Sequence, residues 1–196
     1  MSKSYMLVFL LFLITGLSIN KNSVFAEENV NRLIMSEIYL DEDEPSKNWI
    51  EVYNPTDEPL TLMRLRLSTL LTPNILPPEY KEGIEILPKN RIVLCALDKN
   101  IETNAVKVEI IPLSVTLRGG FIGIETKKEK GVINKEENVD VIRFGDSERS
   151  SYVKAFSNIQ VIPMQKNGKS FSRDISIQNS NNTLPSFIES DPTPGE

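Results

Sequence analysis

The chain has 196 residues, with 22 basic and 27 acidic side chains, one cysteine and no histidine. It therefore lacks the commonest general base at neutral pH and the commonest zinc ligand, and serine or cysteine nucleophiles paired with histidine are excluded. Neither of the glycine motifs G-x-x-x-x-G-K and G-x-G-x-x-G, which bind nucleotides, occurs in it. We expect no enzyme activity, no catalytic residue, no metal ligand and no cofactor. A hydrolase using a Ser-Lys or carboxylate pair is the catalytic alternative.

The first 26 residues have the pattern of an export signal. Lys3 precedes an apolar run that begins at Met6, and its length of about 14 residues is below the roughly 20 that a membrane-spanning helix needs. Val24 and Ala26 suit a signal peptidase, which places the new N-terminus at Glu27. We predict a protein that is secreted or held in the cell envelope, with no membrane span after cleavage. An uncleaved anchor is the alternative.

The charge of the mature chain argues against nucleic acid as a partner. Removing Lys3 and Lys21 from the 22 basic residues, and none of the 27 acidic ones, leaves a net charge of −7. Proteins that bind nucleic acid usually gather basic side chains on one face, whereas here they are scattered. The densest group, Lys127, Lys128 and Lys130, alternates with acids and is interpreted as a solvated hairpin loop.

Short apolar segments bounded by turn residues predict a single all-β domain over residues 27–196, with its core at about 32–195. No helical periodicity, internal repeat or second domain is evident. Cys95 lies in an apolar run, which favours a buried, inert thiol over a reactive one. The predicted strands are 32–40, 48–53, one that begins at 60, 84–87, 91–97, 106–110, 115–118, 121–126 and 139–144.

Several irregularities are expected between these strands. The apolar phase moves from Leu60 and Leu62 to Leu65 and Leu67, which predicts a one-residue bulge near residues 63–64. The prolines of 71–80 indicate a loop or an edge excursion. The two glycines at 119–120 predict the turn of a β-hairpin. A surface excursion is expected over 145–169, and the tail from residue 179 is expected to pack by side chains such as Phe187 without regular structure.

Two segments are candidates for binding, and a third is a candidate for modification. The acidic run 41–44 offers oxygen ligands for calcium, although it lacks an EF-hand pattern and a solvated turn is favoured. Trp49 and Tyr53 share the strand face opposite Ile50 and Val52. They form either an aromatic platform for a sugar or partner, or a patch buried under the excursion that starts at residue 145. The sequence 181–183 has the form of a glycosylation sequon.

Three polar residues within or next to predicted strands are given structural roles. Glu51 lies in the middle of a strand, where an ion pair across the sheet is favoured over ligand contact. Its candidate partners are Arg64, Arg66 and Arg173. Asp140 and Ser170 are expected to lie near strand ends and to form hydrogen bonds with nearby backbone.

Four segments, taken in order, resemble the lamin tail domain. They are Leu-Ile-Met-Ser-Glu-Ile at 33–38, Trp-Ile-Glu-Val-Tyr-Asn-Pro-Thr at 49–56, Val-Asp-Val-Ile-Arg-Phe-Gly at 139–145, and Gly-Lys-Ser-Phe-Ser-Arg at 168–173 with the terminal Pro-Thr-Pro-Gly at 192–195. The resemblance covers nearly all of 32–195. It implies an immunoglobulin-like β-sandwich of the kind found in nuclear lamins and in exported bacterial proteins.

The functional expectation rests on that resemblance. It favours a secreted, non-catalytic module that binds another protein or a cell-surface polymer, for example in adhesion. The binding residues are not identified by the sequence. A calcium-dependent carbohydrate-binding module, using the 41–44 loop and Trp49, is the alternative, followed by an accessory to a secreted hydrolase.

Overall fold

The computed structural model describes residues 31–68, 75–96, 101–114, 119–127, 139–145, 160–164, 167–175 and 184–196. Within these ranges the regular structure is almost entirely β, with three short 3-10 helices. The strands are β1 (Ile34–Tyr39), β2 (Trp49–Tyr53), β3 (Leu60–Ser68), β4 (Ile84–Ile86), β5 (Arg91–Cys95), β6 (Val106–Glu109), β7 (Gly119–Lys127), β8 (Val139–Gly145), β9 (Val161–Ile162), β10 (Ser170–Arg173) and β11 (Phe187–Ser190). The helices are η1 (Pro45–Lys47), η2 (Pro78–Tyr80) and η3 (Ile111–Ser114).

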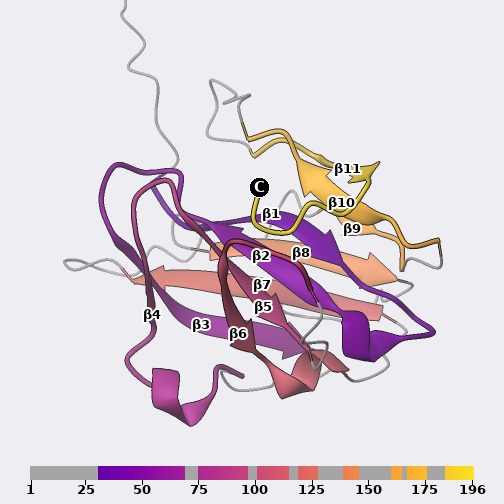
Figure 1. Ribbon diagram of the computed structural model, residues 1–196, viewed down its shortest axis with the longest axis horizontal. Coiled ribbons are helices and arrows are strands. Elements are labelled where there is room, and N and C mark those ends of the chain that lie inside the picture. Colours follow the sequence, from indigo (N-terminus) through magenta and orange to yellow (C-terminus); the bar gives the residue numbers. More distant parts are fainter. Residues whose placement is uncertain are drawn as a thin grey trace, which may run out of the picture.

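The strands form two sheets packed face to face (Figure 1). One sheet has six strands in the order β11-β10-β1-β2-β5-β6, and the other has five in the order β4-β3-β7-β8-β9. Most neighbours are antiparallel, while β5 with β6 and β8 with β9 are parallel. The prediction of an all-β sandwich is confirmed.

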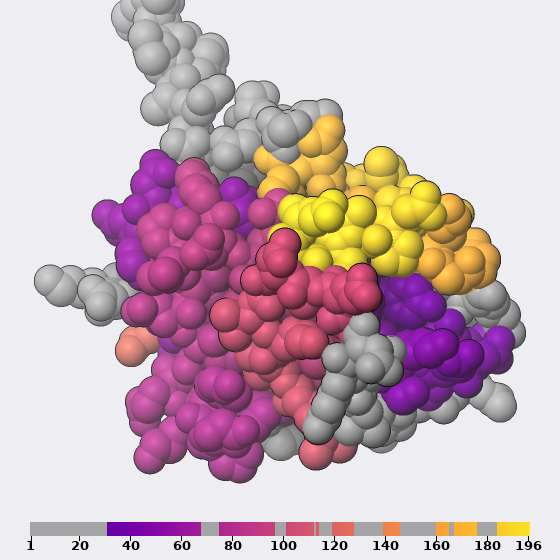
Figure 2. Space-filling model, in the orientation of Figure 1, coloured from indigo at the N-terminus to yellow at the C-terminus, as the bar shows by residue number. Residues whose placement is uncertain are grey.

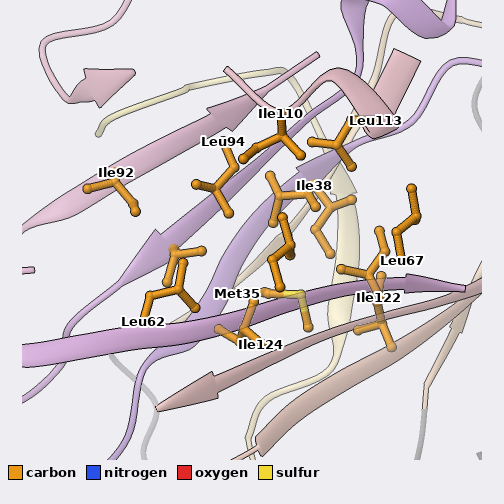
Figure 3. Packing of buried hydrophobic residues seen from close by; sticks show 14 of the residues in the cluster. Met35, Ile38, Leu62, Leu67, Ile92, Leu94, Ile110, Leu113, Ile122 and Ile124 are labelled. Atoms are coloured by element: carbon orange, nitrogen blue, oxygen red, sulfur yellow. The ribbon is translucent and has the colours of Figure 1, made fainter. Parts of the chain in front are cut away.

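The core between the sheets follows from the alternation of apolar and other residues along each strand. In β2, Ile50 and Val52 point inward and are fully buried, and in β5 Ile92 and Leu94 point inward and are buried as well. Figure 3 shows side chains of both sheets meeting in this layer, with Leu62 and Ile124 of one sheet facing Met35 and Leu94 of the other. Because side chains on a strand alternate between its two faces, Glu51 and Arg91 lie on the outer face of the six-stranded sheet.

The bulge predicted in the third strand is confirmed. The register between β3 and β7 shifts between Leu62 and Arg64, so that both Leu62 and Leu65 reach the core. A second shift lies between Met35 and Glu37 in the pairing of β1 with β2. Met35 and Ile38 are both buried in the core, which leaves Glu37 on the outer face.

Three local predictions were wrong. Gly119 and Gly120 are not a hairpin turn but the start of β7, where they pair with Gly145 and Phe144 of β8. The excursion over 145–169 contains β9, and the tail contains β11, which pairs along β10. Phe187 is buried as predicted. Residues 75–80 contain no strand, in agreement with the predicted loop, whereas the predicted strand 115–118 lies outside the described residues.

Asn54 fixes the loop that follows β2. Its side-chain amide donates hydrogen bonds to the carbonyls of Glu58 and Ile86, both at 2.8 Å, and its side-chain oxygen accepts from the backbone N–H and hydroxyl of Thr56 at 3.0 and 2.7 Å. Asn54 is completely buried. The Asn-Pro-Thr motif is thus a structural turn that joins the two sheets, because Glu58 precedes β3 and Ile86 belongs to β4.

Candidate functional site

Two glutamates lie side by side on the outer face of the six-stranded sheet. Glu37 of β1 is directly opposite Glu51 of β2 in the strand register. Each of them is only 2% exposed. Acidic side chains are rarely buried without partners, so the hydrogen-bond donors around this pair define the chemistry of the site.

Glu51 accepts three hydrogen bonds. The Ser36 hydroxyl lies 2.5 Å and the Arg91 Nε 2.9 Å from Oε1, while the backbone N–H of Gly195 lies 2.6 Å from Oε2. Burial raises the pKa of Glu51 above its ordinary value, and the nearby Glu37 carboxylate adds to the rise. The bonds from Ser36 and Gly195 and the charge of Arg91 act in the opposite direction.

Glu37 is held mainly by residues near the C-terminus. The Ser170 hydroxyl donates to its Oε1 at 2.5 Å. Thr193 donates twice, from its backbone N–H to Oε1 at 3.1 Å and from its hydroxyl to Oε2 at 3.0 Å. Arg91 therefore pairs with Glu51, whereas the bonds to Glu37 described here come from hydroxyl and backbone donors.

The C-terminal segment, defined as residues 191–196, lies across this face. In Figure 1 it runs from β11 over β1 toward β2, and in Figure 2 it lies beside the surface formed by residues 101–109. Its Thr-Pro-Gly-Glu end forms a turn in which the Glu196 N–H donates to the Thr193 carbonyl at 3.1 Å. Pro194 followed by Gly195, with φ of 91°, is the residue pattern of a type II turn.

Gly195 sits where a side chain would not fit. A Cβ at this position would overlap the Thr103 hydroxyl and press against Ala105 at 3.2 Å. Its positive φ also disfavours any residue with a Cβ. Glu37 thus selects a threonine hydroxyl at the first position of the turn. Thr103 and Ala105, together with the positive φ, select glycine at the third.

Trp49 lies next to this site but is not an open platform. It is 4% exposed and packs with Val93 and Cys95 under Tyr39, Ile101 and Ala105. The described residues that cover it come from β1 and the 101–105 segment, while most of the excursion after Gly145 that had been considered lies outside the described residues. Tyr53 is half-buried under Arg91, whose guanidinium lies 4.5 Å from the ring centre.

Cys95 is buried, as predicted, and its thiol donates to the Val108 carbonyl at 3.6 Å.

The predicted partners of Glu51 were wrong. Arg64 and Arg66 lie near Glu125, at 3.4 and 3.8 Å. Arg173 pairs with Asp140. The true partner, Arg91, lies on β5, next to β2, and shares the outer face.

Asp140 and Arg173 form a buried ion pair between the sheets. Arg173 of β10 donates to both carboxylate oxygens of Asp140 on β8, at 2.6 and 3.2 Å, and their side chains are 5% and 4% exposed. Asp140 also accepts from the Met35 N–H at 2.8 Å, while Arg173 donates to the Met35 carbonyl at 3.1 Å. As predicted, Asp140 and Ser170 lie at strand ends and bond backbone groups, of Met35 and Ser190 respectively. The prediction did not include their side-chain partners, Arg173 and Glu37, which are distant in the sequence.

The acidic run 41–44 folds back on its own loop. The Asp41 carboxylate accepts from the N–H groups of Asp43 and Glu44, both at 2.8 Å, and from the Tyr39 hydroxyl at 3.2 Å. Glu44 forms an ion pair with Lys47. In the described part of the chain, no group of three or more acidic or cysteine side chains is arranged to hold a metal ion.

Two further predictions concern residues mostly beyond the described ranges. Lys127 is the last residue of β7, but Lys128 and Lys130 lie outside the described residues, as does the sequon 181–183.

Sequence reasoning missed Glu37, Arg91, Thr193 and Gly195 as members of one site. The signals in the sequence were the resembling segments 33–38, which contains Glu37, and 192–195, which contains Thr193 and Gly195, but neither indicated a partner. No described helix is long and apolar enough to cross a membrane. In comparisons with known proteins, no protein-family model matches the chain, and no curated protein or solved structure is significantly similar to it.

Proposed function

We propose that the chain is an exported, non-catalytic β-sandwich of lamin-tail type that binds another polypeptide through the outer face of its six-stranded sheet. One observation carries this proposal. The carboxylates of Glu37 and Glu51 already hold a peptide segment there, using its backbone N–H groups and one hydroxyl. Carboxylate-to-amide hydrogen bonds are charge-assisted, which suits recognition of a chain in a fixed conformation.

The lamin-tail assignment is supported by the roles of the motif residues. Asn54 organises the loop after β2, Asp140 and Arg173 connect the sheets, and Thr193 with Gly195 closes the outer face. Residues from all four resembling segments thus belong to buried polar networks. These hydrogen bonds join segments that are far apart in the chain, which is a structural reason for the motifs to occur together.

A non-catalytic role is supported by the engagement of the acidic side chains. Glu37, Glu51 and Asp140 each accept several internal hydrogen bonds, and each is at most 4% exposed. A general base must reach a substrate proton directly or through one water molecule. Here donors of the C-terminal segment and of the neighbouring strands already engage the carboxylate oxygens that a substrate or a water molecule would have to reach.

Labelled mature protein tests the proposal when it is added to intact producing cells and to their secreted proteins. We expect saturable binding that is lost after the cells are treated with protease. Binding that survives protease and is removed by polysaccharide-degrading enzymes would instead favour a surface polymer. No saturable binding to either fraction would contradict the proposal.

A further inference from the structure

The outer face of the six-stranded sheet holds the C-terminal segment by hydrogen bonds that a segment of a separate chain could also form. Three of the bonds to Glu37 and Glu51 come from Thr193 and Gly195, which lie 156 and 144 residues further along the chain. Pro194 restricts the backbone of the turn before it binds, which lowers the entropy lost on docking. The same turn on a separate chain would present identical donors.

Every copy of the protein therefore carries both halves of a complementary contact. One half is the glutamate pair with Ser36, Ser170 and Arg91, and the other half is the terminal Thr-Pro-Gly turn. Exchange of an identical element between copies is a low-cost route to association, because every contact is already present within one copy. The segment lies on the surface and meets the sheet from outside, so its removal does not open the core between the sheets (Figure 2).

We propose that this face is a receptor for a Thr-Pro-Gly turn and that a second copy of this chain supplies the turn by exchanging its C-terminal segment. The inference deepens the proposed function, on which it rests, by naming the partner. Within one copy the tethered segment competes with any added chain at an effective concentration on the order of millimolar. Weakening the resident turn is therefore required before binding of a separate one can be measured.

The first experiment uses a labelled peptide with the sequence of residues 190–196. The receptor is the full chain carrying Thr193→Val and Gly195→Ala, which removes a hydroxyl donor and introduces the Cβ overlap. Fluorescence anisotropy should show binding at least about tenfold tighter than to the unmodified chain, equivalent to about 1.4 kcal/mol. A peptide with alanine in place of its glycine should not bind.

Gly168 provides a matched control. It also has a positive φ, of 71°, but a Cβ there would meet no atom within 4 Å. Gly168→Ala imposes a similar backbone strain, in the turn before β10, without adding an overlap or removing a donor to the glutamates, so its affinity for the peptide should equal that of the unmodified chain.

The second experiment tests exchange between whole chains. A chain with Glu37→Gln and Glu51→Gln keeps its turn but loses the two carboxylates, whereas the chain with Thr193→Val and Gly195→Ala keeps the carboxylates. Light scattering should show each chain alone as a monomer and, in their mixture, a dimer whose fraction rises with concentration. If the double glutamine chain does not fold, Glu51→Gln alone replaces it.

The proposal is overturned if the folded receptor variant binds neither the peptide nor the complementary chain. It is also overturned if the alanine peptide binds as well as the native one. If the protein does not bind cells but the receptor variant binds the peptide, the proposed function is wrong and the exchange of C-terminal segments still holds. If the protein binds cells but the receptor variant does not bind the peptide, only the exchange is wrong.

Discussion

Replacing Asp140 with alanine should destabilise the protein severely. The change leaves the Arg173 guanidinium, 5% exposed, without its counter-charge and the buried Met35 N–H without an acceptor. Removing one partner of a buried ion pair costs about 3–5 kcal/mol. Because proteins are stable by only about 5–15 kcal/mol, this variant should lose at least roughly a fifth of its stability. In a chain of this length the melting temperature should fall by about 6–20 °C.

Urea unfolding monitored by fluorescence gives the measurement, since Trp49 is the only tryptophan and is buried. Glu125→Ala is the matched control. Its carboxylate lies 3.4 Å from the guanidinium of Arg64, whose side chain is 49% exposed, so this ion pair is at the surface. The loss there should be at most about 1 kcal/mol. A double variant with Asp140→Leu and Arg173→Met should lose less than Asp140→Ala, since no buried charge remains.

A loss below about 1 kcal/mol for Asp140→Ala, or one equal to that of Glu125→Ala, would refute the reasoning. Such a result would mean that the ion pair between β8 and β10 is solvated in solution. The connection between the two sheets at this position would then have to come from apolar contacts alone.

Three further predictions follow from the same structure. The folded protein raises the pKa of Glu51 above its ordinary 4.5, so the folded state binds this proton more tightly than the unfolded state does. Protonation of Glu51 therefore stabilises the folded state. This contribution is complete below the unfolded-state pKa and is lost as the pH rises through the folded-state pKa. Unmodified protein should therefore lose stability relative to Glu51→Gln as the pH rises above about 4.5, and a pH-independent difference in urea unfolding would disprove it. Asn54→Ala should cost roughly 2–4 kcal/mol because it removes the donor to the buried carbonyl of Ile86 and the acceptor for Thr56; a loss no larger than that of Asn167→Ala, which breaks only an exposed bond, would count against this. Mass spectrometry of exported protein should give a chain that begins at Glu27, and an intact N-terminus would favour the anchored alternative.

The fold was predictable where a local pattern determines it. Alternation in 49–53 and 91–95 shows which side chains face the core, and the shift of phase after Leu62 predicts the bulge. The glycine pair at 119–120 gave a wrong prediction, because two adjacent glycines between short apolar segments are the usual local pattern of a hairpin turn. The structure instead pairs them with residues 144–145 of β8, and that choice depends on the whole sheet.

The candidate site was not predictable for the same reason. The alternation of apolar and polar residues places Glu51 and Arg91 on the side of their strands that faces away from the core. It does not show that β2 and β5 are neighbours in the sheet. The register, in which Tyr53 is opposite Arg91, brings the arginine within reach of Glu51. Thr193 and Gly195 approach only after β11 has paired with β10, and no pattern within the tail indicates that pairing.

Amide hydrogen exchange at Thr193 and Gly195 tests the central claim most directly, since both N–H groups donate to buried carboxylates. Residue-resolved NMR should show exchange slowed by at least about a hundredfold relative to an unstructured peptide, and Glu51→Gln should weaken the protection of Gly195 more than that of Thr193. Exchange of both amides at the unstructured rate in the folded protein would contradict the account.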